Sequence, residues 1–542
     1  MTNEAIAADD IVIDTVFFAQ AHVQQPHQPY FRLVGDRDTL IKAHVVSPSG
    51  TKAPPVTAEL SLDGDRKRLV LEGPATLPRS LPGEPGKVEH RFADSFTAMI
   101  PAEWVRRGLR VSVTAGDRRH VIDDLAIGAP IRIPMTVLDI HYFGYEDADY
   151  PGDWVNELFV KRRIARLDVQ RIPRILFPEL VVPPRAGLPA VRCTCTDDYQ
   201  VKTGTPFNGK QAAALQWQGA LQRAGGQCRL TLFYISIANV PSGGEAWAFG
   251  GVGKLGRLPL FHHELGHAFS VAHLCDEPHY PYRGTMHGIP GPDGAEGPHV
   301  GPTWGFDPRP GLPGAEPGKP FFISPVIPAN TVRGQPGTWK NEPQAGASAA
   351  HEPGHLLTMY SDWSLHKMQA YAEQHVVYWS DERQAYVTWD DETATYSKAI
   401  ENNGVSFPVE RDVEVYSVIA SISAVTAEAN FVYRPVGPYV SGLIDRFDPG
   451  VAEDRARFRK AYGNEGRCDV SLRIVQRGKT QTFMLPLEWR PDDDPLARAS
   501  LRTAAVNVPV RDGEVTAAEL LLTPDAVAHG LPADPKILHR WG

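Results

Sequence analysis

The sequence predicts a multidomain α+β protein, and three observations lead to this fold class. With 542 residues the chain is too long for one hydrophobic core, so about two to four domains are expected. Near both ends, apolar and polar residues alternate in short runs that are separated by turn residues, as they do in β-sheets. The middle of the chain combines apolar runs with stretches of helical period, which indicates an α/β unit.

The first domain is predicted to span residues 1–128. Its runs IVIDTVFF, TAELSLDG and LRVSVTAGDRRHVI have the alternation and spacing of a β-sandwich of immunoglobulin size, so an immunoglobulin-like fold is expected. It carries no group of His, Cys, Asp and Glu with the spacing of metal ligands. We therefore expect it to pack against its neighbour or to present a substrate to it.

The second domain is predicted to span residues 129–378 and to contain the α/β unit. The apolar run MTVLDIHYFG opens it, and the amphipathic stretch DWVNELFVKRRIARLDV follows. The basic triplet Lys161–Arg163 is expected on the solvated face of this helix. A second helix should run from Lys210 to the glycine pair 225–226, before the buried strand RLTLFYISIANV.

A stretch rich in Pro and Gly, Pro278–Gly354, is too long for a plain connector and is expected to shape a cleft. A short helix is predicted after it, at SDWSLHKMQAYAEQH. Ser361 is the expected N-cap of this helix, and Leu365, Met368 and Ala372 should share one face.

Residues 379–542 return to strand patterns and are predicted to form a C-terminal β-rich domain. The segment DVSLRIVQRGKTQTFMLPLEW is typical of a hairpin, with its turn at Arg477 and Gly478.

Composition excludes several classes of partner. The chain is 42% hydrophobic and 22% charged with a net charge of -9, which argues against nucleic acid and against an anionic membrane surface. No apolar run approaches the length of a membrane helix, and the start MTNEAIAADD has no signal-peptide pattern. The five cysteines are expected to be structural thiols or to form a single bridge: Cys193, Cys195, Cys228, Cys275 and Cys468.

The strongest chemical signal is the segment HELGHAFSVAH, which begins at His263. Residues four apart lie on one face of a helix, so His263 and His267 can direct their imidazoles at one metal ion. His273 can supply a third imidazole if the helix stops near Ser270 and the chain turns back. Three neutral imidazoles are the protein ligands of an open, catalytic Zn²⁺ site.

Glu264, one position after the first histidine, is the predicted general base. In this hypothesis it takes the proton of the attacking water and later hands it to the leaving amine. Removing Glu264 should abolish turnover and leave the metal bound, whereas removing a histidine should cost the metal.

Two neighbouring features are interpreted as non-ligands. HEPGH, at residues 351–355, also fits the short zinc motif, but Pro353 disfavours a regular helix, so a structural or exposed loop is expected. His262 points about 100° away from His263 on a helix and is expected at the surface or in support of the site.

Several stretches resemble one known family over most of the chain. HELGHAFSVAH resembles the metzincin signature HExxHxxGxxH, and FFAQAHVQQP, LVGDRDTL, PAEWVRRGL, VGPTWGFDPR and FFISP resemble the StcE and TagA family of secreted bacterial zinc metalloproteases. The resemblance implies a metzincin-like catalytic domain behind an immunoglobulin-like domain, an endopeptidase that acts on glycoproteins, and export from a Gram-negative bacterium. Members of the StcE branch cut mucin-type, O-glycosylated segments.

The chain departs from the family pattern at two points. Ser270 stands where the signature has glycine, at a cost of roughly 1 kcal/mol for a left-handed turn. The segment that resembles the family's methionine turn places Gln344 where the methionine is expected, and Met359 and Met286 are the alternatives.

Two rival functions remain open. One is a non-enzymatic glycoprotein-binding protein that keeps the zinc fold, although a structural site has no need of Glu264. The other is a zinc amidase on a non-peptide substrate; an edge strand that could pair with a peptide, such as LFYISIANV, would favour the endopeptidase.

Overall fold

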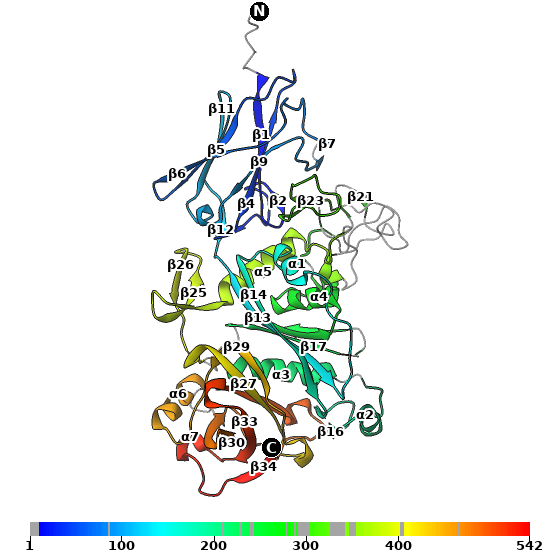
Figure 1. Ribbon diagram of the computed structural model, residues 1–542, viewed down its shortest axis with the longest axis vertical. Helices are drawn as coiled ribbons and strands as arrows, with labels where there is room; N and C mark the ends of the chain where they lie inside the picture. Colours follow the sequence, from blue (N-terminus) through cyan, green and yellow to red (C-terminus); the bar gives the residue numbers. More distant parts are fainter. Residues whose placement is uncertain are drawn as a thin grey trace, which may run out of the picture.

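The computed structural model describes most of the chain, namely residues 10–84, 87–207, 210–226, 230–238, 240, 243–277, 279–282, 285–286, 289–290, 301, 303–325, 342–345, 354–401, 406–462 and 467–542. Within this part, strands predominate and seven α-helices lie between them. The sheets follow one another along the long axis, from the first strands at one end to the last strands at the other (Figure 1). The prediction of a multidomain α+β protein is confirmed.

Two four-stranded sheets form the N-terminal unit. Their orders are β2-β1-β4-β9 (Val23–Gln24, Val12–Ala19, Thr39–Val46, Phe96–Ile100) and β11-β10-β5-β6 (Arg118–Ile122, Arg110–Ala115, Val56–Leu62, Asp65–Val70). Alternate residues of a strand point to opposite faces, so Phe18 and Ile41 of the first sheet share one buried core with Leu60 and Val113 of the second. The predicted immunoglobulin-like class of this unit stays a prediction.

A five-stranded sheet forms the centre of the molecule. Its order is β14-β13-β17-β19-β18 (Arg166–Phe177, Arg132–Tyr142, Leu232–Ile237, Gly250–Lys254, Glu245–Trp247). The first four strands are parallel, and the edge strand β18 is antiparallel to β19. β17 is buried along its whole length, as its β-branched and aromatic residues predict.

The expectation that LFYISIANV forms a substrate-pairing edge strand is wrong. This segment contributes β17, which pairs with β13 on one side and with β19 on the other. A continuous apolar run is typical of an interior parallel strand, which must be buried on both faces. The edges of the sheet are β14 and β18.

Helices cover both faces of the central sheet (Figure 1). On one face pack α1 (Trp154–Val160), α4 (Leu258–Ala268) and α5 (Asp362–His375), and on the other packs α3 (Lys210–Ala224). The predicted extent of α3 is confirmed. In α5, Ser361 caps the N-terminus as predicted, because its Oγ accepts from the amide of Ser364.

The basic triplet Lys161–Arg163 lies in the interior, so its predicted place on a solvated helix face is wrong. α1 ends at Val160, and β14 begins at Arg166, so the helix is shorter than its amphipathic pattern indicated. Lys161 is 1% exposed, and the two arginines are 5% exposed each.

Each cation of the triplet has buried acceptors in a different part of the molecule. The three contacts are Lys161 Nζ to Asp307 Oδ2 at 3.5 Å, Arg162 Nη2 to the carbonyl of His262 at 3.3 Å, and Arg163 Nη2 to Gln24 Oε1 at 2.8 Å. Buried charges persist only where such partners exist. The triplet therefore connects strand β22 (Gly305–Asp307), the histidine helix α4 and the N-terminal unit.

The C-terminal part is built from three sheets. The small sheet β24-β25-β26 (Val377–Ser380, Ala385–Asp390, Thr395–Lys398) follows α5. β27 (Glu410–Ile422) pairs with β28 (Phe431–Val432), β29 (Val436–Ile444) and β32 (Arg502–Pro509). The last sheet is β31-β30-β33-β34 (Lys479–Leu485, Val470–Gln476, Val515–Leu522, Lys536–Trp541). The predicted hairpin is confirmed, since Arg477 and Gly478 join β30 to β31 with φ of 46° and 77°.

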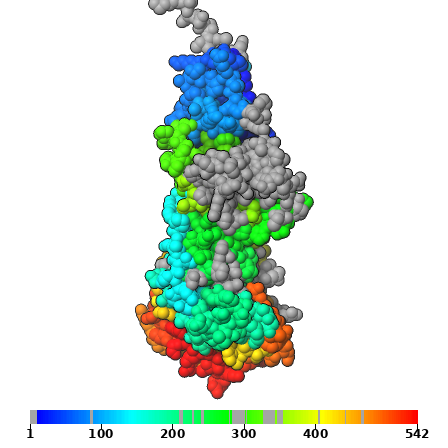
Figure 2. Space-filling view, turned by 90° about the vertical axis from the view of Figure 1, so that its right-hand side faces the viewer, coloured from blue at the N-terminus to red at the C-terminus, as the bar shows by residue number. Residues whose placement is uncertain are grey.

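The molecule is elongated, with the N-terminal unit at one end (Figure 2). That unit is bonded directly to the centre: the amide of Val23 donates to the carbonyl of Trp304 at 2.9 Å, and Phe306 donates to the carbonyl of Ala21 at 2.8 Å. No described helix combines the length and the apolar character that a membrane crossing requires. Cys193, Cys195 and Cys468 are free thiols, whereas Cys228 and the side chain of Cys275 lie outside the described residues.

Candidate metal centre

Helix α4 presents His263 and His267 on one face, as their spacing predicts. Its apolar residues Leu258, Phe261 and Leu265 are buried in the core over the central sheet and fix the rotation of the helix. The two histidine rings are T-shaped, with centroids 4.7 Å apart.

The chain reverses directly after α4 and returns His273 to the same point. Ser270 adopts φ of +66°, the left-handed conformation expected for the glycine of the signature. The amide of Val271 then donates to the carbonyl of Gly266 at 3.1 Å. This turn lets a residue beyond the end of the helix join the two histidines on it.

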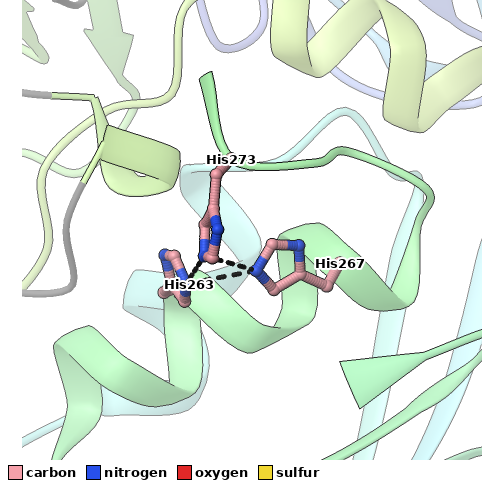
Figure 3. A group of neighbouring side chains, drawn as sticks. All are labelled: His263, His267 and His273. Atoms are coloured by element: carbon pink, nitrogen blue, oxygen red, sulfur yellow. Dashed lines mark hydrogen bonds between the residues drawn. The ribbon is translucent and has the colours of Figure 1, made fainter. Parts of the chain in front are cut away.

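The Nε2 atoms of the three histidines form a nearly equilateral triangle (Figure 3). The separations are 3.2 Å for His263–His267, 3.3 Å for His267–His273 and 3.3 Å for His263–His273. Carbonyl oxygens orient two of the rings from behind: Pro343 lies 2.7 Å from Nδ1 of His263, and Val271 lies 2.7 Å from Nδ1 of His267. These contacts place the proton on Nδ1 and leave the Nε2 lone pairs to converge.

Burial favours the neutral form of the two helix-borne histidines. It lowers the pKa of His263 to about 4 and also lowers the pKa of His267. A neutral imidazole is the form that binds a metal ion.

Glu264 lies beside the histidines and is 3% exposed. Burial, reinforced by the charge of Glu245, raises the pKa of its carboxyl to about 8. Its Oε2 has no hydrogen-bond partner among the described residues. A Cβ at Gly244 would lie 2.3 Å from its Oε1, so the chain just before β18 closes over this carboxyl.

Sequence comparison assigns the chain to a family. The family model for peptidase M66 matches residues 87–377, which is more than half of the chain. The match includes His263, Glu264, His267 and His273. The chain belongs to the peptidase M66 family. Membership in this family of peptidases, which are generally metal-dependent, implies a protein substrate.

Curated relatives of this M66 peptidase carry the name dictomallein. The chain is 28% identical to dictomallein of Burkholderia pseudomallei (strain 668), over 98% of this chain and 84% of that protein. Dictomallein of Burkholderia mallei (strain ATCC 23344) matches with the same identity and coverage. Dictomallein-2 of Dictyostelium discoideum is 23% identical, over 97% of this chain and 95% of its own length.

The side chain of Gln344 supports the backbone of the histidine helix in this M66 peptidase. It is 1% exposed, and its Nε2 donates to the carbonyl of His263 at 2.6 Å. A Cβ at Gly266 would lie 1.7 Å from this Nε2, so a larger residue there would displace the amide of Gln344. Met359, an alternative for the methionine turn, instead packs near Gly305, and the side chain of Met286 lies outside the described residues.

His262 lies in the interior, so the surface half of its prediction is wrong and the supporting half agrees with its contacts. It is 1% exposed, and its Nε2 lies 3.2 Å from the carbonyl of Thr358. Its own carbonyl accepts from Arg162 and from the hydroxyl of Tyr360. Sequence reasoning missed Arg162 and Tyr360, because neither lies near α4 in the sequence.

A second group of potential ligands consists of Glu157, Asp307 and His355. Lys161 Nζ lies 2.7 Å from His355 Nδ1, and Arg309 donates to both carboxylates. Burial alone would raise the pKa of Glu157, but the hydrogen bond with His355 and the two cations lower it. Because Lys161 and Arg309 already balance the two carboxylates, this group is a structural ion cluster.

This cluster accounts for part of the second HExxH pattern. His355, the last residue of HEPGH, is 3% exposed, which agrees with the structural alternative of the prediction and not with the exposed one. His351, Glu352 and Pro353 lie outside the described residues.

Proposed function

We propose that this M66 peptidase is a zinc-dependent endopeptidase in which His263, His267 and His273 bind one Zn²⁺ and Glu264 acts as the general base. The observation that carries the proposal is the triangle of Nε2 atoms, with sides of 3.2, 3.3 and 3.3 Å. Tetrahedral zinc with Zn–N bonds of about 2.0–2.1 Å requires N···N separations of about 3.3–3.4 Å. The described side chains therefore fit this ion without rearrangement.

The chemistry of the donors supports the same conclusion. Three imidazole lone pairs that converge within 3.3 Å repel one another unless a cation lies between them. Zinc, when bound, supplies a Lewis acid that polarises a peptide carbonyl and lowers the pKa of water toward about 7.

The residues of the chain itself perform the proton transfers. Glu264 accepts the proton of the attacking water and delivers it to the leaving amine. Its burial, and the close approach of Gly244, keep bulk water away from the carboxyl. Pro343 and Val271 hold the rings of His263 and His267 in the tautomer that presents Nε2.

The edge strand β18 is the proposed binding strand for an extended substrate. It directly follows Gly244, and the side chains of Glu245 and Trp247 are exposed on it. An edge strand can pair its free backbone groups with a peptide. This favours the endopeptidase over an amidase on a non-peptide substrate, and buried Glu264 favours an enzyme over a glycoprotein-binding protein.

The finer family assignment is part of the same proposal. Four parallel strands, an antiparallel edge strand and a third histidine after a left-handed turn support a metzincin-like domain in residues 129–378. We assign residues 1–128 to an immunoglobulin-like domain and residues 379–542 to a β-rich one. The resemblance to the StcE and TagA family supports O-glycosylated proteins as substrates and export from the cell.

The experiment compares the protein with its Glu264→Ala variant on a heavily O-glycosylated mucin and on the deglycosylated mucin, each with and without a chelator. We expect cleavage of the glycosylated mucin only, and only by chelator-free protein that keeps Glu264. Cleavage of neither mucin would rule out the glycoprotein substrate. Equal cleavage by both proteins would rule out the role of Glu264.

A further inference from the structure

A cavity lies at the edge of the central sheet opposite the histidines. It has a volume of about 730 Å³, within the range of roughly 300–1,000 Å³ that ligand sites occupy. It lies where β13 and β14 begin, and residues of β24, β25, β27 and β29 complete its lining. Because β14 and β18 are opposite edges, four strand spacings of about 4.8 Å separate it from the proposed substrate strand.

The free edge of β14 opens into this cavity. Five consecutive residues, Arg166–Gln170, line it. Successive side chains of a strand point to opposite faces, so a cavity that all five residues line must reach the edge of the strand. Among the described strands β14 pairs only with β13, which leaves the outer backbone groups of this segment for another chain.

Arg411 lines the cavity and forms no ion pair among the described residues. The register of β27 against β29 shifts between Glu410 and Val413, and Asp412 has φ of +54°, so Arg411 belongs to a bulged segment. Bulges of this kind redirect a side chain, and strained backbone is concentrated at functional sites. By contrast, the other arginine of the rim, Arg166, is paired with Asp168 at 2.7 Å.

Trp379 holds the Arg411 guanidinium in place. The Cζ atom lies 3.6 Å from the centroid of the ring. In the described part of the chain no carboxylate lies within ion-pair distance of Arg411. A guanidinium that is fixed by stacking loses little entropy when it binds a carboxylate with two hydrogen bonds.

The aromatic rings around the cavity are already engaged, which argues against a sugar-stacking site. Arg411 covers one face of Trp379, and Tyr386 stacks on Phe407 with centroids 4.6 Å apart. The lining also includes aliphatic side chains, namely Val377, Leu443 and the 57% exposed Val440. Aliphatic walls beside a free strand edge suit the side chains of a polypeptide.

We propose that this groove is an exosite for an extended polypeptide segment that carries an acidic side chain. The segment pairs with the backbone of Arg166–Gln170, its carboxylate binds Arg411, and an apolar side chain contacts Val377 and Leu443. That the segment belongs to a protein substrate rests on the proposed function. The exosite then holds that substrate at a point remote from the bond that is cut.

The test measures binding by fluorescence anisotropy, using the full-length Glu264→Ala protein so that the probe stays intact. The probe is a labelled peptide of alternating threonine and glutamate. We expect Arg411→Gln to weaken binding about tenfold, since it removes a charge-assisted bidentate contact. Arg490→Gln removes an exposed arginine that pairs with Glu488 outside the groove, and it should leave the affinity unchanged.

Two further peptides test the mode of binding without altering the protein. A counterpart with glutamine in place of glutamate, and one N-methylated at alternate backbone positions, should each bind about tenfold more weakly. Equal binding of all three peptides, or equal affinity of the Arg411→Gln protein, would overturn the exosite. So would displacement of the probe by sialyllactose, which would assign the groove to a saccharide, or a dimer that Arg411→Gln abolishes.

The binding assay requires no cleavage, so its outcome is independent of the proposed reaction. In the protein that retains Glu264, Arg411→Gln should raise KM for a protein substrate and leave kcat/KM for a short peptide unchanged. If neither substrate is cut, the proposed function fails while the binding result stands. If KM does not change although both are cut, the exosite fails while the proposed function stands.

Discussion

At the scale of single residues, two buried side chains support the backbone of α4 behind the histidines. Gln344 and Tyr360 both donate to carbonyls of α4, one to His263 and the other to His262. Both side chains approach Gly266, where a Cβ would lie 1.7 Å from Gln344 Nε2 and 2.9 Å from Tyr360 Oη. Packing therefore disfavours a larger residue at the glycine of HELGH.

We predict that Gly266→Ala destabilises the protein by about 1–3 kcal/mol, because a buried donor must move aside. Gln344→Ala should make room, so the double variant should lose less than the sum of the single losses. Urea unfolding of the three variants measures this coupling. Gly219→Ala is the control, since its Cβ in α3 would only meet Arg223 Nη1 at 3.4 Å. Strict additivity would contradict the packing argument.

The candidate site shows what a sequence can predict at this scale. Spacing alone predicted that His263, His267 and His273 converge, because helical period and one turn determine their positions. Arg162 could not be found this way. Its pattern is that of a solvated helix, and only the tertiary structure supplies the carbonyl of His262 as its partner.

At the scale of elements, β4 contains a buried cation that the pattern of its strand does not indicate. Lys42 is fully buried beside His44, and its Nζ lies 5.3 Å from the centroid of Phe17. Burial lowers its pKa from 10.5 to about 7. The folded protein therefore gives up this proton at a lower pH than the unfolded chain does.

This depressed pKa makes stability depend on pH in a known direction. The contribution of Lys42 is fully present above about 10.5 and is lost as the pH falls through about 7. As the pH falls through this range, the free energy of unfolding of Lys42→Met should rise relative to that of the unaltered protein, by on the order of 4 kcal/mol. Thermal unfolding between pH 7 and 10 measures it. Lys67→Met alters a side chain that is 38% exposed and should leave the pH dependence of stability unchanged. If the stabilities of Lys42→Met and of the unaltered protein changed with pH in parallel, the account would be contradicted.

Element types were predicted better than element surroundings. The helices α3 and α5, and the hairpin β30–β31, follow from local signals such as caps, glycines and alternation. β17 was predicted to lie at an edge of the sheet, where it could pair with a substrate. The prediction failed because an apolar run has the same pattern wherever its strand lies in a sheet. Which strand is outermost depends on chain topology.

At the scale of the whole molecule, the N-terminal unit is part of the support of the site. His22 Nε2 lies 3.0 Å from the carbonyl of Tyr360, and Gln24 Nε2 donates to Asp362 at 3.2 Å. Arg163 donates to the carbonyl of Tyr30 at 2.7 Å. It directly follows Arg162, which donates to the carbonyl of His262. These contacts are buried, so water cannot replace them without rearrangement.

We predict that the chain without residues 1–128 does not form a stable catalytic unit. Its Phe306 and Phe322, which share a buried apolar cluster with Phe17 and Val23, would be exposed to water, at about 1.5–3 kcal/mol for each fully buried side chain. Calorimetry and soluble yield of residues 129–542 measure this. An unfolding temperature equal to that of the full chain would contradict it.

The central claim is a three-histidine zinc site with a separate base, and metal content measured together with activity tests it most directly. Purified protein and its Glu264→Gln, His267→Ala and His120→Ala variants are analysed for bound zinc and for cleavage of a mucin. His120 lies exposed on β11 and serves as the control. We predict one equivalent of zinc in all but His267→Ala, and cleavage only by the unaltered protein and the control. Loss of zinc from Glu264→Gln, or full activity without zinc, would contradict the account.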